Sequence, residues 1–227
     1  MEYIDRFDLF PTPVLRYGFK DIELHHENLV KYLARDDLYF KDKERNGVQT
    51  TDGDLFNHKE MEPVYNLFTE CFNDAMDKFG YEKDHGIISM WATRQRDGGF
   101  HHQHIHKNTF LAAVLYLFDI DGTASGTTFH NLNRNLHQID PRHKKDADRF
   151  FKDSENIPFI NGTVLVFPGW ASHSTIPSPS RYRIMVAANM MPIGRTTSDH
   201  YDQYYYHDPK EKGYLNLVDH IKEGYSK

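Results

Sequence analysis

The sequence contains a single cysteine, only two tryptophans and no long hydrophobic run. One cysteine excludes an intrachain disulfide framework and any cysteine-rich zinc module. The longest apolar segments, 110–118 and 163–168, are far too short to cross a bilayer, and the chain opens on acidic residues instead of a basic-then-apolar leader. Basic residues number 27 against 33 acidic ones, so a net charge of −6 gives no general attraction to phosphate. We therefore expect a cytoplasmic protein without a membrane partner. The acidic balance disfavours nucleic acid as a substrate, although local basic residues do not exclude it.

The 227 residues suit one domain, which we expect to span 1–227. Its first part, 1–85, begins with a proline-containing extended segment and continues with helices predicted at 22–35 and 63–79. The second helix has apolar residues at three- and four-residue steps and is flanked by Pro63 and Gly80, which are typical of a helix start and end.

The part from 86 to 194 has a different texture, with short runs of β-branched and aromatic residues between turn sequences. Strands are predicted at 87–95, 110–118, 127–130, 163–167 and 183–191. No helical crossover lies between them, so the fold class is mainly β with N-terminal helices (α+β), with an antiparallel jelly-roll core. The charged segment 131–156 is predicted to be an insertion, either a long surface loop or a short helix. The tyrosine-rich tail, 195–227, is expected to pack over the domain.

Histidines gather in the segment 99–108, which reads GFHHQHIHKN. In an extended strand alternate side chains share a face, so His102, His104 and His106 would point the same way. Two imidazoles two residues apart form a pair of metal ligands, and a third ligand must then come from a neighbouring strand. His173 is the best candidate, because it follows an apolar strand and a Pro-Gly turn.

Ten residues beyond His173, Arg183 opens the last apolar strand. A buried arginine requires an anionic partner and is suited to bind a carboxylate through two hydrogen bonds. Each feature alone has an ordinary interpretation. The histidine-rich segment could bind metals weakly and without function, His173 could be a histidine satisfied by local hydrogen bonds, and Arg183 could pair with an acidic side chain. The combination is more specific than any of its members.

In these motifs the chain resembles the Fe(II)- and 2-oxoglutarate-dependent oxygenases, a superfamily with a double-stranded β-helix that includes the prolyl hydroxylases. It is most similar to small bacterial and phage members with the pattern Gly-x-x-His-His-x-His-x-His-Pro-Asn-Ser, which is matched here from Gly99 to Thr109. The strand 112–117, the segment 166–175 and the stretch from Arg183 to Asn189 match later parts of the pattern, so the resemblance covers residues 7 to about 194.

The resemblance implies a dioxygenase that consumes O2 and 2-oxoglutarate, with ascorbate as a reductant. Such an enzyme hydroxylates an unactivated C–H bond and releases succinate and CO2. It further implies that His104 and His173 are catalytic ligands of Fe(II) and that His106 stands where the superfamily has Asp or Glu. Arg183 would bind the distal carboxylate of 2-oxoglutarate, assisted by Tyr116.

The main departure from the superfamily is the absent carboxylate. With three neutral imidazoles the metal keeps its full double positive charge until an anionic chelator arrives. His102 with His104 is a rival ligand pair, and two histidines plus water is another arrangement; we favour His104 and His106. Met185, Lys107 and the pair Ala112-Ala113 also replace residues common among relatives.

Two other functions fit part of the pattern. A cupin-type metal enzyme that does not use 2-oxoglutarate would also carry His-x-His on a jelly roll, but it gives Arg183 no role. A non-catalytic jelly-roll binding module would leave the histidines incidental. Among substrates we favour a peptide side chain and keep small molecules as an alternative; the sequence does not indicate an oligomeric state.

Overall fold

The two α-helices precede most of the strands, as the sequence predicts, but one short strand comes before the first helix and another before the second. The computed structural model describes residues 11–18, 22–40, 46–81, 85–96, 98–132, 152–192, 194–195 and 204–205. The strands are β1 (Leu15–Gly18), β2 (Val48–Thr50), β3 (His85–Arg96), β4 (Leu111–Asp119), β5 (Thr127–His130), β6 (Ser154–Ile157), β7 (Thr163–Pro168), β8 (His173–Ser174), β9 (Tyr182–Pro192), β10 (Gly194–Arg195) and β11 (Tyr204–Tyr205). The α-helices are α1 (Ile22–Leu33) and α2 (Glu62–Phe79), with short 3-10 helices at Asp36–Leu38, Leu55–Asn57 and Lys59–Met61.

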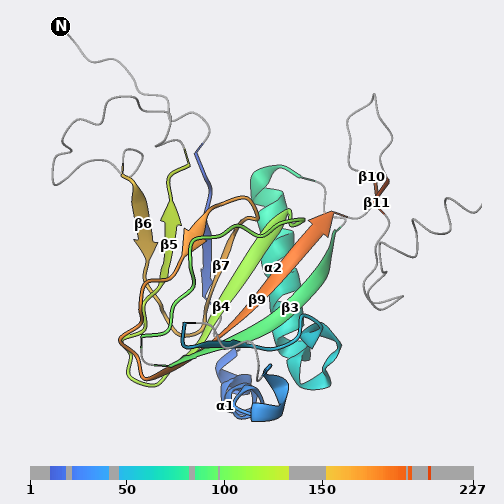
Figure 1. The fold of residues 1–227 in the computed structure, drawn as a ribbon. Helices are drawn as coiled ribbons and strands as arrows, with labels where there is room; N and C mark the ends of the chain where they lie inside the picture. The colour runs from blue at the N-terminus through green and yellow to red at the C-terminus, as the bar shows by residue number, and fades with distance from the viewer. Residues whose placement is uncertain are drawn as a thin grey trace, which may run out of the picture.

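Two antiparallel sheets form the core of the molecule (Figure 1). The larger has the order β1-β7-β4-β9-β3-β2 and the smaller the order β6-β5-β8. From β3 onward the chain passes back and forth between the two sheets. Strands β3, β4, β7 and β9 belong to the larger sheet, and β5, β6 and β8 belong to the smaller one. This interleaving of antiparallel strands is the jelly-roll, or double-stranded β-helix, topology that the sequence predicts.

Strand β4 is buried on both faces, which explains its unbroken apolar sequence. Its residues Leu111, Ala113, Leu115 and Leu117 belong to the core that the larger sheet shares with the helices. The alternating residues Ala112, Val114 and Tyr116 belong to a second core on the opposite face, with residues such as Phe167 and partly buried Phe129. Burial on both faces is favourable only for apolar side chains, so the usual polar alternation is absent.

Helix α2 covers one face of the larger sheet (Figure 1). It buries an apolar stripe made of Val64, Leu67, Phe68, Cys71, Phe72, Ala75 and Met76. Gly80 ends the helix in the left-handed conformation with φ 76°, and its backbone N–H donates to the carbonyls of Asp77 and Met76. Both predicted helices are therefore present; the first ends at Leu33, two residues before its predicted end.

Two sequence-based predictions need correction. Strand β6 begins at Ser154, inside the segment 131–156 that was predicted to lack strands. Its sequence, SENI, is polar because β6 is the edge strand of the smaller sheet, and its residues are alternately exposed and half-exposed. The histidine segment 99–108 is extended but is no strand, since only His104 forms an isolated bridge, to His173.

Other predictions fall outside the described residues. These are the extended segment before residue 11, the middle of the insertion at 133–151, and nearly all of the tail beyond residue 195. Within the described part of the chain, none of the helices combines the length and the apolar character that a membrane span requires.

Candidate metal centre

The candidate centre forms where the histidine segment runs beside the segment that leads into β8. The backbone N–H of His104 donates to the carbonyl of His173, and the N–H of His173 donates back to the carbonyl of His104, both at 2.9 Å. Two residues further, the N–H of His106 donates to the carbonyl of Gly169 at 2.9 Å. These bonds fix residues almost 70 positions apart in one register, so His104 faces His173 directly.

Gly169 allows this close approach. A Cβ atom at this position would lie 2.2 Å from the carbonyl oxygen of Thr109, much nearer than any side chain tolerates. Its backbone N–H also donates to the carbonyl of Phe110 at 2.9 Å. The glycine in the Phe-Pro-Gly turn therefore lets the two ligand-bearing segments pack backbone against backbone.

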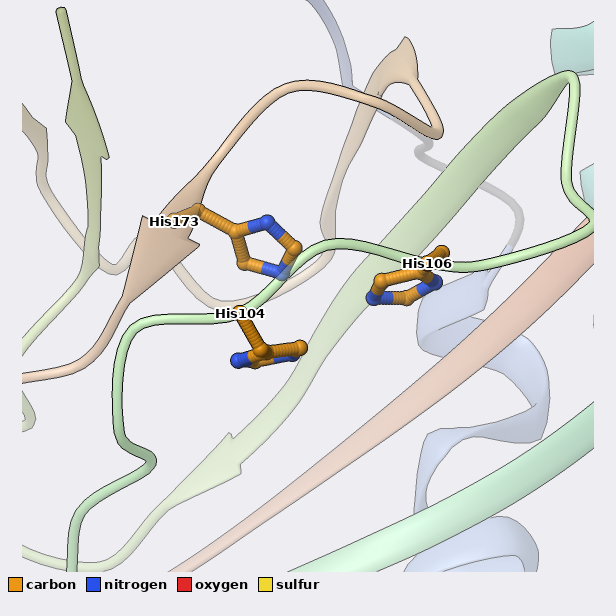
Figure 2. A group of neighbouring side chains, drawn as sticks. All are labelled: His104, His106 and His173. Carbon is orange, nitrogen blue, oxygen red and sulfur yellow. The ribbon is translucent and has the colours of Figure 1, made fainter. Parts of the chain in front are cut away.

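The side chains of His104, His106 and His173 converge on one point (Figure 2). Each offers a ring nitrogen, and these atoms all lie within 4.8 Å of one another. The ring centroids of His104 and His173 are 4.3 Å apart, those of His106 and His173 5.0 Å apart, and the rings of His104 and His106 stack at 5.5 Å. His173 is buried, His106 is half-buried and His104 is exposed, so the centre opens to solvent on one side.

Hydrogen bonds hold all three rings in the tautomer that leaves Nε2 available to a metal. The Nδ1 atoms of His104 and His173 lie 2.7 Å and 2.9 Å from the carbonyl oxygens of His102 and Ala171. The Nδ1 atom of His106 lies 2.6 Å from the side-chain oxygen of Asn189. An oxygen of this kind only accepts, so each Nδ1 carries the proton and each Nε2 keeps a free lone pair.

Burial also favours the neutral imidazoles that bind metals. It lowers the pKa of His173 to about 3, with a smaller opposing effect of the hydrogen bond to Ala171. It lowers the pKa of His106 as well, against the opposing effect of the hydrogen bond that His106 donates to Asn189. Proton position, charge state and convergence thus fit a divalent metal ion. Within the described residues this metal-binding cluster contains no carboxylate.

His102, the rival ligand, lies apart from this cluster. Its side chain is exposed, and its ring meets Phe100 edge-on at 5.0 Å between centroids. Because the segment is irregular here, the two-residue alternation that would align His102 with His104 does not hold. The structure therefore brings His104 together with His106 and His173 and not with His102.

Arg183 is fully buried at the start of β9 and faces the interior between the sheets. Its Nε donates to Gln95 Oε1 at 2.5 Å, and its Nη1 donates to the carbonyl oxygen of Ser125. Its Nη2 has no partner. None of the ion pairs between described residues includes Arg183. Its cross-strand neighbour Asp119 accepts hydrogen bonds from Ser180 Oγ and the Ala124 N–H instead.

Among the described residues, no acidic side chain forms an ion pair with this buried guanidinium. Desolvation by burial lowers its pKa to about 10, and Tyr116 and Asp119 offset only part of that effect. A buried cation of this kind is costly unless an anion binds it. An orphaned Nη2 group therefore fits a carboxylate that is not part of the chain.

Tyr116 lies in the same core. Its hydroxyl is hydrogen-bonded to Thr127 Oγ1 at 2.7 Å, and its ring stacks on Phe159 at 4.5 Å between centroids. Burial raises the pKa of the hydroxyl, which therefore keeps its proton at neutral pH. No hydrogen bond joins Tyr116 to Arg183 in the described structure. To donate to a carboxylate, the Tyr116 hydroxyl would have to give up its hydrogen bond to Thr127.

Sequence reasoning missed several polar residues around the centre. Asn189 belongs to the matched motif, but nothing in the sequence showed that it would contact His106. Gln95 ends a predicted strand without any distinctive neighbour, and it meets Arg183 only because β3 and β9 pair in this register. A search for polar residues on otherwise apolar strands would have found both.

Comparisons with known proteins agree with this geometry. Residues 89–189 match the model of the family described as "Putative 2OG-Fe(II) oxygenase". No curated protein matches the chain.

Among solved structures, the chain is similar to a Pseudomonas putida prolyl-4-hydroxylase, with 14% identity, a TM-score of 0.56 and coverage of 82% of this chain and 95% of that one. It is also similar to HygX from Streptomyces hygroscopicus with nickel, 2-oxoglutarate and hygromycin B bound, with 13% identity, a TM-score of 0.57 and coverage of 87% and 93%. A third similar structure is the non-heme alpha ketoglutarate dependent epimerase SnoN, with 11% identity, a TM-score of 0.60 and coverage of 81% and 80%.

The segment that matches this family model contains His104, His106, His173 and Arg183. The chain is accordingly an enzyme of the 2-oxoglutarate-dependent non-haem iron class, whose cofactor is Fe(II) and whose co-substrates are 2-oxoglutarate and O2. The three histidines fit the iron, and the unpaired guanidinium fits one end of the keto acid.

Proposed function

We propose that this enzyme hydroxylates an unactivated C–H bond of its substrate and releases succinate and CO2. The observation that carries the proposal is the pairing of two features in one core. Three histidines offer ring nitrogens within 4.8 Å of one another, and a fully buried arginine without an acidic partner among the described residues lies in the same interior. A metal centre with an anion-binding group inside the fold suits a keto acid that chelates at one end and carries a carboxylate at the other.

The residues would divide the work as follows. His104, His106 and His173 hold the iron through Nε2, while their Nδ1–H groups stay bonded to oxygen acceptors that fix each ring. Arg183 binds the distal carboxylate of 2-oxoglutarate, and Tyr116 assists. Bound iron, together with 2-oxoglutarate and O2, supplies the oxidising power. The apolar core around Phe167, Phe129 and Ala171 excludes water from one side of the centre.

The three-histidine ligand set has an electrostatic consequence. A carboxylate ligand would cancel one of the two positive charges of the metal, whereas neutral imidazoles cancel none. The centre should therefore hold the free metal more weakly than a two-histidine-one-carboxylate site does. It should bind an anionic chelator more strongly, so that keto acid and metal support each other's binding.

The proposed substrate is a peptide side chain, such as a prolyl group. Exposed apolar residues flank the ligands: Ile105 lies between two of them at 44% exposure, and Trp170, three residues before His173, is 51% exposed. Such a rim suits an extended segment with small apolar side chains. Similar structures include a prolyl-4-hydroxylase and a HygX complex with hygromycin B, so a small molecule is the alternative substrate class.

Turnover without the substrate tests the reaction. The purified protein, supplied with Fe(II), ascorbate, O2 and 2-oxoglutarate, should form succinate slowly and in a 2-oxoglutarate-dependent manner. His104→Ala and His173→Ala should abolish this turnover, while His102→Ala, a change in an exposed neighbour, should not. Equal succinate formation by wild type and both ligand variants would reject the assignment.

The substrate class needs a separate measurement. Incubation of the active enzyme with a library of proline-containing peptides, followed by mass spectrometry, should reveal products heavier by one oxygen atom. Addition of a productive peptide should also increase the rate of succinate formation. A lack of both effects with peptides, together with stimulation by a small molecule, would favour the alternative class.

A cupin-type metal enzyme without 2-oxoglutarate and a non-catalytic binding module account for the fold but leave Arg183 unexplained. In both cases a fully buried guanidinium would need an anion within the chain, and among the described residues it has none. Anaerobic titration with Fe(II) and 2-oxoglutarate separates these functions, because only the oxygenase should develop a visible metal-to-ligand charge-transfer band.

A further inference from the structure

Three buried side-chain nitrogens in the protein interior lack a hydrogen-bond partner. They are Gln95 Nε2, His101 Nε2 and Arg183 Nη2; the one other buried side-chain atom without a partner among the described residues is the Tyr17 hydroxyl oxygen. Gln95 is 1% exposed and Arg183 is fully buried, so water does not readily replace the missing partners. Buried polar groups are normally satisfied, so a group of orphans marks a place where a ligand supplies the bonds.

The orphaned atoms belong to residues that lie together. Gln95 on β3 and Arg183 on β9 are directly opposite each other in the sheet register, and Gln95 Oε1 accepts from Arg183 Nε at 2.5 Å. That bond turns the amide of Gln95 so that its oxygen faces the guanidinium and its NH2 group faces away, without a partner. Gln95 thus presents two donor hydrogens beside a cation.

His101 lies beside the metal ligand His104, on the segment that follows β3. Its ring centroid is 6.0 Å from that of His104. Gly99, two residues before His101, packs against Gln95, since a Cβ on Gly99 would lie 3.1 Å from the Cβ of Gln95. The backbone of His101 is fixed by Thr175, whose Oγ1 accepts from the His101 N–H at 2.8 Å and whose N–H donates to the His101 carbonyl at 3.1 Å.

A second buried arginine shows what a purely structural pair looks like in this fold. Arg94 Nε donates to Gln49 Oε1 at 2.7 Å, in the same way that Arg183 bonds to Gln95. Arg94, however, also has an ion pair with Asp36 at 2.7 Å and lies 4.1 Å from the ring centre of Tyr39. The chain itself therefore supplies the anion for Arg94, whereas the described chain supplies none for Arg183.

We propose that His101 and Gln95, together with Arg183, bind the distal carboxylate of 2-oxoglutarate and so make the enzyme select a dicarboxylic 2-oxo acid. This inference rests on the proposed function. A carboxylate has about four lone-pair positions, and the unpartnered nitrogens Arg183 Nη2, Gln95 Nε2 and His101 Nε2 supply N–H donors for them. His101 would contact the carboxylate on the side of His104, and Gln95 on the side of β3.

A comparison of two keto acids tests the assignment. 2-Oxobutyrate has the same metal-chelating end as 2-oxoglutarate but lacks the distal carboxylate. With the Ni(II)-loaded protein, dissociation constants of both acids are measured by calorimetry for wild type and variants. His101→Leu and Gln95→Glu should each raise the dissociation constant of 2-oxoglutarate by about tenfold or more, since hydrogen bonds to charged groups are lost. The dissociation constant of 2-oxobutyrate should change less than about twofold.

The variant Gln95→Glu is the sharper of the two. It places a carboxylate beside Arg183, so the chain then supplies the missing anion and competes with 2-oxoglutarate. The melting temperature of Gln95→Glu should not fall, although its 2-oxoglutarate affinity does. Gln49→Glu beside Arg94 and His102→Leu on the exposed part of the histidine segment are matched controls, and both should bind the two acids like wild type.

Each other result overturns the inference. Equal weakening of both acids would mean that His101 shapes the metal end instead of the carboxylate end. Unchanged affinity of folded variants would mean that the orphaned nitrogens are not used. These results leave the proposed function intact if wild type binds 2-oxoglutarate, whereas failure of the Ni(II)-loaded wild type to bind it overturns both. If His101→Leu does not fold, Gln95→Glu decides alone, and His101→Gln, which keeps an amide donor, should retain most of the affinity.

Discussion

Asn189 on β9 and His106 on the histidine segment are joined by a 2.6 Å contact between Asn189 Oδ1 and His106 Nδ1. The other two candidate ligands direct Nδ1 to backbone carbonyl oxygens, so only His106 depends on a side chain for its tautomer and orientation. Asn189 is thus a positioning residue for the ligand that stands where relatives of this superfamily have a carboxylate.

Replacement of Asn189 should therefore weaken the metal site without removing a ligand. Asn189→Leu is expected to raise the Ni(II) dissociation constant by about 10- to 100-fold, as is typical when the hydrogen-bond partner of a metal-bound histidine is lost. Asn189→Asp keeps an acceptor oxygen and should retain most of the affinity. Asn156→Leu, which removes a bond to Thr128 on the smaller sheet, is the control. Equal Ni(II) binding by the Leu and Asp variants would show that Asn189 does not orient the ring.

The ligand variants should differ in their effects on the fold. His104→Ala and His173→Ala are both expected to be purified without bound iron and to form no succinate. His173 is 5% exposed and packs against Phe167, whereas His104 is exposed, so only His173→Ala should also lower the free energy of unfolding, by roughly 1–3 kcal/mol. Metal analysis and denaturant titration of the metal-free proteins measure the two effects; matching stability losses in both variants would contradict this difference in packing.

The two buried arginines should respond in opposite ways to replacement by methionine. Arg183→Met removes an uncompensated buried cation, so it should leave the stability unchanged or higher while it raises the 2-oxoglutarate requirement more than the iron requirement. Arg94→Met breaks the pair with Asp36 and should cost about 1–3 kcal/mol while 2-oxoglutarate binding stays normal. Thermal melts and titrations of each ligand provide the comparison. If Arg183→Met raises both requirements equally, Arg183 has a structural role only.

Gly169 should tolerate no side chain. The Cβ of Gly169→Ala would meet the Thr109 carbonyl at 2.2 Å, and both segments that carry the ligands would have to separate. We expect a loss of about 3 kcal/mol or more in unfolding free energy and weaker Ni(II) binding. Gly18→Ala is a suitable control, because no atom lies within 4 Å of the added Cβ. A stable Gly169→Ala variant with normal metal affinity would show that the close approach is unnecessary.

Metal and keto acid should stabilise the fold in a fixed order. A ligand that binds only the folded state adds about 2.7 kcal/mol when its concentration is 100 times its dissociation constant. Ni(II) should therefore raise the melting temperature of chelator-treated protein, and 2-oxoglutarate should raise it further only when Ni(II) is present. An equal shift by 2-oxoglutarate in the absence of metal would mean that the keto acid binds elsewhere.

Much of the fold could be predicted from local sequence patterns. The periodicity of α2 and the apolar runs of β3, β4, β7 and β9 reflect burial, which each segment encodes by itself. Strand β6 escaped prediction because an edge strand with one exposed face needs no apolar run. Strand β8 is only two residues long, too short for any pattern.

The site could be predicted only where the spacing of residues in the sequence indicates their chemistry. His104, His106 and His173 could be proposed as ligands because imidazoles at these intervals are unusual in a β core. Gln95 and Asn189 could not, since their contacts depend on which strands pair and in which register. Gln95 and Arg183, for example, are 88 positions apart in the chain and opposite each other in the sheet.

The unequal burial of the three ligands affects how the enzyme acquires its metal. His173 is buried and His106 is half-buried, while His104 is exposed beside Ile105. An incoming ion can shed its water step by step, meeting the outer imidazole first and the inner two afterwards. Loading and exchange of the ion would then need no unfolding of the chain.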